Sequence, residues 1–179
     1  MPVKINTGSL VKMAAFAAIT AILSQISIPT QPVPVNLALL SPMLAGWLLG
    51  PMYGMISQLV YLLLGAAGVP VFAGFTGGLG HLVGPTGGYI VSYIFMAGVT
   101  GAFRKRLRGK VLLMGLVNIL SVLVCYTLGS AWFMASLHRD LLSALAVCVV
   151  PFIIGDLLKA AACAWLAKRL MAIPIFRAA

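Results

Sequence analysis

Two ionisable side chains lie inside a long apolar run of the sequence, and they are the first candidates for chemistry. Asp156 and Lys159 occur within PFIIGDLLK, and a spacing of three residues puts both on one face of a helix. An ionisable residue at membrane depth is costly and by default indicates function. We predict that this polar pair binds a ligand, with Lys159 facing an anionic group and Asp156 accepting from an N–H donor. A salt bridge that only fastens this helix to a neighbour is the alternative.

A glycine- and proline-rich stretch at residues 65–88, GAAGVPVFAGFTGGLGHLVGPTGG, is the second candidate. Irregular backbone survives at membrane depth only where protein or a water-filled cavity satisfies its polar groups, and such interruptions point to a transporter's binding site. The glycines let backbone N–H groups converge on an anion, while Phe72, Phe75 and Tyr89 supply apolar walls. The alternative is tight helix packing through small residues four positions apart, at Gly74, Gly78, Gly80, Gly84 and Gly88.

The sequence lacks the motifs of several other kinds of chemistry. The segment GPTGG is not a P-loop, because G-x-x-x-x-G-K-[ST] is missing, so no nucleotide hydrolysis is assigned to this chain. Neither His81 nor His138 stands in a recognisable arrangement with a serine, and GxSxG and HExxH are absent, so we do not expect an enzyme. Cys125, Cys148 and Cys163 form no CxxC or Cys/His cluster. We therefore expect neither a metal nor a cofactor.

The composition identifies the kind of protein that must position these residues. Hydrophobic residues make up 62% of the 179 residues and charged residues 8%, with a mean hydropathy of +1.12. A soluble domain carries roughly 25% charged residues, so we predict an integral membrane protein surrounded by lipid. The net charge of +10 comes from bases that lie between apolar segments. It indicates membrane topology and not binding to nucleic acid.

Charge and hydropathy together predict an all-α protein with six transmembrane helices and both termini in the cytoplasm. Five bases at residues 104–110 and two N-terminal lysines belong on the cytoplasmic side, so an even number of spans separates them. This parity divides the apolar stretch 37–64, interrupted at Gly50, into two short spans. The Gly-rich loop between the third and fourth helices then faces outward, as does the extended segment IPTQPVPV at residues 28–35. The predicted spans are about 10–28, 37–49, 52–64, 88–103, 111–135 and 142–166.

Two local features refine this topology. Pro151 indicates a helix break in the last span, which would reduce the depth of Asp156 in the membrane. The first span has a smooth stripe of alanines that permits close approach of another helix, either within the protein or in a docking partner. The stripe consists of Ala14, Ala17, Ala18 and Ala21.

The order of several motifs resembles the BioY family, the biotin-specific S components of energy-coupling-factor (ECF) transporters. The likeness extends from about Ala14 to Lys159, nearly the whole chain. Family members often carry Thr and Gln after PVP-x, whereas this chain has Asn36 and Ala38. The matching motifs are PVPV (32–35), LAGWLLGP (44–51), GVPVFAGFTGG (68–78), GPTGGY (84–89) and PFIIGDLLK.

The resemblance implies a six-helix protein of the cell membrane that captures biotin from outside. Family members associate with a transmembrane T component and two ATP-binding-cassette ATPases, and the S component is thought to topple to release its substrate. An alanine motif contacts the T component, a role that Ala14–Ala18 or Ala17–Ala21 would take. The D-x-x-K pair of the family maps onto Asp156 and Lys159. Its Gly-rich loop maps onto 71–89, which makes substrate contacts of Phe72, Gly74, Phe75, Gly78 and Tyr89.

The chemistry of biotin agrees with the residues. One cation, one anion and aromatic walls suit a molecule with a carboxylate, a ureido ring and an apolar remainder. On charge grounds Lys159 belongs near the carboxylate, and a pose with Asp156 and Lys159 both at the ureido ring stays open. The alternative functions are a self-sufficient facilitative or proton-coupled vitamin carrier, an S component for another vitamin, and an assembly subunit without a ligand.

Overall fold

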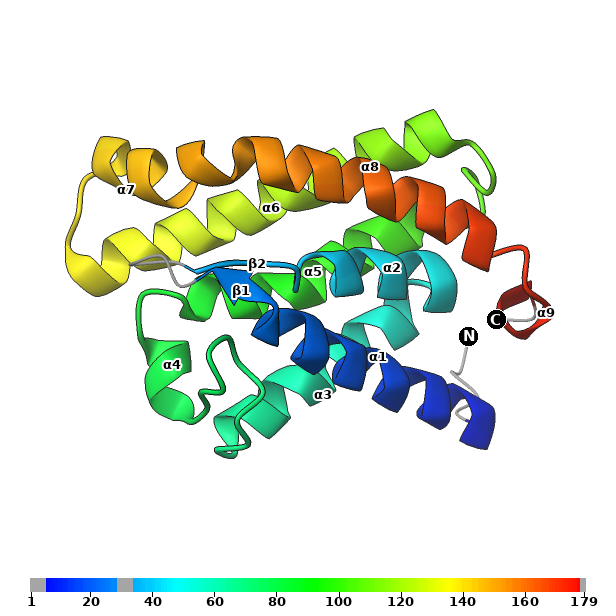
Figure 1. The fold of residues 1–179 in the computed structure, drawn as a ribbon, viewed down its shortest axis with the longest axis horizontal. Coiled ribbons are helices and arrows are strands. Elements are labelled where there is room, and N and C mark those ends of the chain that lie inside the picture. Colours follow the sequence, from blue (N-terminus) through cyan, green and yellow to red (C-terminus); the bar gives the residue numbers. More distant parts are fainter. Residues whose placement is uncertain (1–5, 29–33, 178–179) are drawn as a thin grey trace.

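Long helices dominate the computed structural model, which describes residues 6–28 and 34–177 (Figure 1). Most of the predicted extended segment, residues 29–33, lies outside the described residues. The helices are α1 (Thr7–Gln25), α2 (Leu40–Leu49), α3 (Pro51–Ala66), α4 (Leu79–Val83), α5 (Gly87–Phe103), α6 (Val111–Leu137), α7 (Leu141–Cys148), α8 (Ile153–Leu170) and α9 (Pro174–Arg177). The strands β1 (Ser27–Ile28) and β2 (Val35–Asn36) form a short antiparallel pair.

Three stretches of the described residues are long and apolar enough to cross a membrane: Thr7–Gln25, Val111–Leu137 and Leu141–Leu170. Helices α2, α3 and α5 are apolar but shorter. The sequence indicated the break between α2 and α3, and the backbone explains it. Gly50 has φ of 86°, which glycine adopts readily, and Pro51 then begins α3 where its missing N–H costs nothing.

The structure adds regular elements that the sequence analysis did not predict. The β1–β2 pair joins the end of α1 to the start of α2, with Ser27 opposite Asn36 and Ile28 opposite Val35. The Gly-rich loop contains the short helix α4 and a bridge between Phe72 and Thr76. The loop is therefore partly ordered by its own backbone hydrogen bonds.

Buried polar side chains join the helices at the centre of the molecule. Trp47 of α2 donates from Nε1 to Oδ1 of Asn118 on α6 at 2.7 Å. Asn118 in turn donates from Nδ2 to the backbone carbonyl of Ala160 on α8 at 2.8 Å. Lipid supplies no hydrophobic drive for helices to associate, so hydrogen bonds and close packing must hold them together. This line of bonds fastens α2, α6 and α8 to one another.

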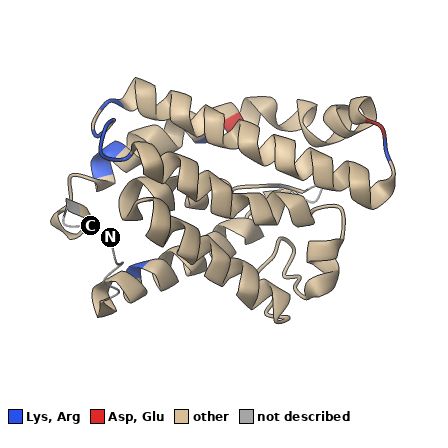
Figure 2. Cartoon of the chain, turned by 180° about the vertical axis from the view of Figure 1, so that it is seen from behind, with Lys and Arg blue, Asp and Glu red and all other residues tan. Residues whose placement is uncertain are grey.

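The start of α1 and the short helix α9 lie at one end of the molecule, which we call the terminal end (Figure 1), and Lys and Arg gather there (Figure 2). The Gly-rich loop and the α6–α7 connection lie at the opposite end (Figure 1). At the terminal end, three cationic side chains donate to backbone carbonyls around α9, and we name them the terminal latch. The bonds run from Lys12 to Ile175 (2.7 Å), from Arg104 to Phe176 (2.8 Å) and from Arg108 to Met171 (2.9 Å).

Candidate ligand-binding site

A cavity of about 440 Å³ opens among α3, the Gly-rich loop, α5, α6 and the α7–α8 region. Its size is within the range of roughly 300–1,000 Å³ that is typical of small-molecule sites. Six aromatic side chains line it: Tyr61, Phe72, Tyr89, Tyr93, Tyr126 and Phe152. Its charged lining residues are Asp156 and Lys159, accompanied by His81 and several hydroxyl and amide groups.

Asp156 and Lys159 form a nearly buried ion pair in the cavity wall. Lys159 Nζ lies 2.7 Å from Asp156 Oδ1, and the side chains are only 10% and 4% exposed for Lys159 and Asp156, respectively. The hydroxyl of Tyr126 on α6 donates to the other carboxylate oxygen, Oδ2, at 2.6 Å. The pair therefore fastens α8 to α6 and also lies in the lining of the cavity. Its charge is balanced without a ligand.

A break between α7 and α8 sets the position of Asp156. Pro151 stands in a 3₁₀ turn, Val150–Phe152, and α8 begins at Ile153. The sequence indicated this break, and its consequence is electrostatic. Asp156 falls in the first turn of α8, where the positive end of the helix dipole stabilises a carboxylate.

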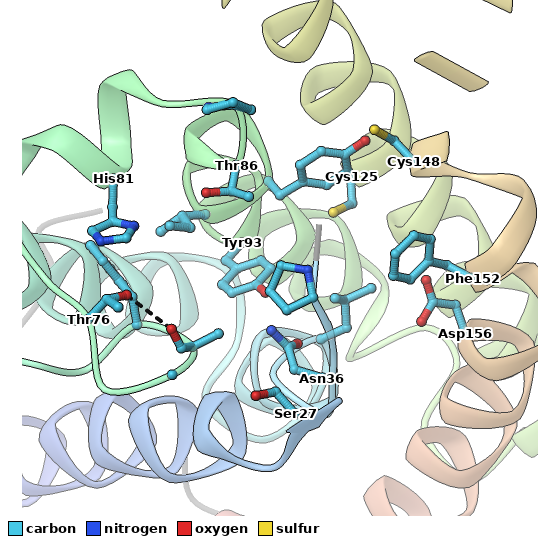
Figure 3. A pocket seen from close by; sticks show the side chains of 18 of the residues that line it. Ser27, Asn36, Thr76, His81, Thr86, Tyr93, Cys125, Cys148, Phe152 and Asp156 are labelled. Atoms are coloured by element: carbon cyan, nitrogen blue, oxygen red, sulfur yellow. Dashed lines mark hydrogen bonds between the residues drawn. The ribbon is translucent and has the colours of Figure 1, made fainter. Parts of the chain in front are cut away.

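Aromatic rings form the opposite wall. Tyr61 meets Phe72 edge to face at 5.6 Å and stacks on Tyr93 at 6.3 Å between ring centroids. Phe72 packs so closely on Gly65 that a side chain at that position would meet its ring. Figure 3 shows His81 and Asp156 at opposite sides of the pocket with Tyr93 between them. The cavity is therefore lined by aromatic rings along its middle and carries polar groups at both ends.

The structure brings most of the predicted site residues together. Phe72, Gly74, Tyr89, Asp156 and Lys159 line the cavity. Phe75 and Gly78 are outside this lining, and the side chain of Phe75 is 73% exposed. Phe75 lies in the tight turn that the bridge between Phe72 and Thr76 closes.

Three tyrosines of the cavity were missed by the sequence analysis. Tyr61, Tyr93 and Tyr126 come from α3, α5 and α6, and each interrupts an apolar helix well away from its ends. A tyrosine at such a position needs a partner for its hydroxyl, which is the signal that could have found it. Tyr126 meets this need at Asp156, and Tyr61 donates to the carbonyl of Val71 at 3.3 Å.

Asn36, where this chain departs from the pattern of the family that it resembles, also lines the cavity. Its Oδ1 accepts from the backbone N–H of Ala38 at 3.1 Å, so the side chain shapes the turn into α2. The position remains polar and keeps access to the cavity.

The alanine stripe of α1 is divided by the packing. Ala17 is buried at 3% exposure and packs within the protein. Ala14 and Ala18 are exposed, and Ala21 is half-buried. The exposed part is therefore the Ala14–Ala18 pair.

The fold and sequence both have close matches among known proteins. The family model described as the BioY family matches residues 1–174. The chain belongs to the BioY family. A BioY relative from Pyrococcus horikoshii, described as a probable biotin transporter, is 41% identical over 88% of this chain and 93% of its own length. The biotin transporter BioY of Thermotoga maritima is 36% identical over 94% of this chain and 98% of its own length.

A solved structure extends the likeness to three dimensions. It is described as the S-component for biotin from an ECF-type ABC transporter and shares 31% identity, with a TM-score of 0.84. The superposition covers 99% of this chain and 98% of the other. This BioY protein therefore has the fold of an S component. Its family consists of transporters and not enzymes, in agreement with the sequence prediction.

Proposed function

We propose that this BioY protein captures biotin in the cavity, on the external side of the cell membrane, for ATP-driven import. The observation that supports this most directly is the Asp156–Lys159 pair at one end of an aromatic cavity. Biotin offers polar groups at both ends and an apolar body between them, which is the distribution that the cavity complements. The two relatives are described as a probable biotin transporter and a biotin transporter, and the solved structure of the same fold as the S-component for biotin.

The ion pair favours the ureido ring over the carboxylate at this end of the cavity. Lys159 is already neutralised by Asp156, so its attraction for a further negative charge is reduced. The pair instead presents N–H donors and carboxylate lone pairs side by side. A ureido group, with its carbonyl and N–H donors, matches both. This pose revises the placement of Lys159 at the biotin carboxylate that charge alone suggested.

Six membrane crossings with both termini in the cytoplasm fit the arrangement of the helices. Helices α1, α2, α3, α5 and α6, with α7–α8 as the last, would provide them. Cytoplasmic segments carry an excess of Lys and Arg, and these residues gather at the terminal end, where α1 begins and α9 lies (Figure 2). The Gly-rich loop at the other end would then face outward.

The energy for import would come from partners, a transmembrane T component and two ATP-binding-cassette ATPases. The sequence has no P-loop of its own. On α1, the exposed Ala14 and Ala18 offer a smooth surface that a partner helix could approach closely. The burial of Ala17 favours Ala14–Ala18 over Ala17–Ala21 as the contact.

Equilibrium titration of the purified protein with biotin tests this function. We expect saturable binding that Asp156→Asn and Lys159→Ala each weaken about 100-fold, which corresponds to about 2.7 kcal/mol. Asp140→Asn is the matched control, because Asp140 is the other acid of the chain and lies outside the cavity. Absence of saturable binding, or binding that neither cavity variant changes, would contradict the proposal. Uptake by the chain reconstituted alone would instead favour a self-sufficient carrier.

Biotin methyl ester separates the two poses. If the ureido ring meets the ion pair, esterification leaves the penalty of Lys159→Ala unchanged. If the carboxylate meets Lys159, the ester and the substitution remove the same contact, and their effects are not additive.

A further inference from the structure

We propose that Ser24 and Gln25, the last two polar residues of α1, act as a clamp that holds the Gly-rich loop in place and thereby sets how long the ligand stays bound. The inference rests on the proposed function only for the identity of that ligand. Neither residue lines the cavity. They are therefore positioning residues that act through the loop.

Gln25 uses both ends of its amide on the loop. Its nitrogen Nε2 lies 3.1 Å from the carbonyl oxygens of both Val71 and Phe72. Its oxygen Oε1 accepts from the backbone N–H of Phe75 at 2.8 Å. Because carbonyls need a donor and an N–H needs an acceptor, these partners fix the orientation of the amide. One side chain thus holds both arms of the turn.

Ser24 reinforces the same point of attachment. Its Oγ lies 2.6 Å from the carbonyl oxygen of Val71, which Tyr61 also approaches at 3.3 Å. With Gln25, three side chains from α1 and α3 converge on one carbonyl of the loop. This concentration exceeds what a single backbone carbonyl needs for satisfaction. It points to a fixed attachment for the residues that follow.

The backbone of the loop requires such support. Gly74 has φ of 74° and Phe75 has φ of 56°, within a turn closed by hydrogen bonds between Phe72 and Thr76. Glycine tolerates this conformation, but a bulky residue adopts it only where the surroundings impose it. Packing cannot impose it on Phe75, whose side chain is largely exposed. The hydrogen bond from the Phe75 N–H to Gln25 Oε1 can impose this conformation.

The segment that the clamp holds also forms one wall of the cavity. Phe72, Ala73, Gly74 and Thr76 line the cavity, whereas the contacts of Ser24 and Gln25 are to backbone groups of residues 71–75. Release of the clamp would free this wall of the cavity. Neutral hydrogen bonds have small net free energies, so they suit an attachment that breaks and re-forms as ligand enters and leaves.

Rates of biotin binding test the clamp. We expect Ser24→Ala to raise the dissociation rate about 10-fold and Gln25→Ala to raise it roughly 10- to 100-fold, with the association rate unchanged or higher. Ser121→Ala is the matched control, because this buried hydroxyl donates within its own helix, to Asn118. A merely structural role would lower the fraction of active protein and leave both rate constants as in the wild type. That result would overturn the proposal.

Hydrogen exchange of the ligand-free protein tests the clamp without biotin. In Gln25→Ala, the amides of Phe72, Phe75 and Thr76 should exchange roughly 10-fold faster, while those of α6 keep their wild-type rates. Unchanged exchange of the loop would overturn the clamp even if biotin binds. If the wild type fails to bind biotin but its loop opens in the variant, the proposed function fails and the clamp stands.

Discussion

The two ends of the molecule fasten a short segment in the same way but with different donors. At the terminal end, the latch residues Lys12, Arg104 and Arg108 donate to carbonyls around α9. At the cavity end, neutral side chains, Ser24 and Gln25, donate to carbonyls of the Gly-rich loop. Hydrogen bonds from charged donors are about twice as strong as neutral ones. The difference agrees with the proposed release of the loop at the cavity end.

Burial of a charged group in the terminal latch affects its pKa. Burial lowers the pKa of the Arg104 guanidinium, and the neighbouring charge of Arg108 lowers it further. An arginine still remains protonated at physiological pH. Arg104 therefore keeps its charge in the latch.

The largest effect is expected for the ion pair at the cavity end. Asp156→Ala leaves Lys159 buried beside Tyr126 without its counter-charge, which should cost roughly 3–5 kcal/mol of unfolding free energy. The double variant Asp156→Ala/Lys159→Ala should regain most of that loss, because no uncompensated charge remains. Unfolding by denaturant in a fixed detergent measures both. A double variant no more stable than the single one would contradict this account of the pair.

The next effect separates the latch from the clamp. Arg104→Ala and Arg108→Ala should each lower the unfolding free energy by about 1.5–3 kcal/mol, since each removes a charged donor to a carbonyl. The biotin dissociation rate should stay within twofold of the wild type. Lys105→Ala, an exposed base of the same loop, is the control. If Arg104→Ala accelerates dissociation as much as Gln25→Ala does, the two ends are not independent.

A smaller effect tests the strained turn. Phe75→Gly removes the bulky residue at positive φ, so the closed loop depends less on Gln25 to hold it. In this background, Gln25→Ala should raise biotin dissociation about threefold less than it does in the wild type. Stopped-flow measurement of the four proteins of this cycle gives the coupling. Full additivity would show that Gln25 does not support Phe75.

The smallest effect lies at the start of α7. The Ser143 hydroxyl and backbone N–H bond to the Asp140 carboxylate and lower its pKa below the usual value. A lowered folded-state pKa adds stability above the unfolded value of about 4, which is lost as the pH falls through the folded value. Stability of the wild type should therefore decrease in this acidic range more than that of Asp140→Asn, which retains a cap acceptor but does not titrate. Parallel pH profiles would contradict this role.

The sequence predicted the parts of the site that its composition made conspicuous. Asp156 stood out because the chain has two acids, and the Gly-rich loop stood out because glycine and proline interrupt apolar helices. The breaks at Gly50 and Pro151 followed from backbone chemistry that tertiary packing does not override. These features depend on local residue types.

The remaining parts depend on packing that no local pattern specifies. Tyr61 and Tyr126 reach the cavity because of how α3 and α6 are rotated about their axes. Phe75, predicted as a wall, is directed outward by a turn with two successive positive φ angles. Gln25 looked like an ordinary polar residue at a helix end, because its partners are backbone groups 46–50 residues away.

Asn118 has a consequence for assembly in the bilayer. A helix surrounded by lipid can turn about its own axis at little cost, because every apolar face is equally acceptable to the acyl chains. The bond from Asn118 to the Ala160 carbonyl removes that freedom from α8, and Trp47 holds Asn118 in turn. Ala160 lies one helical turn after Asp156. Asn118 therefore helps to fix the direction in which the Asp156 carboxylate points, although it is not among the residues that line the cavity.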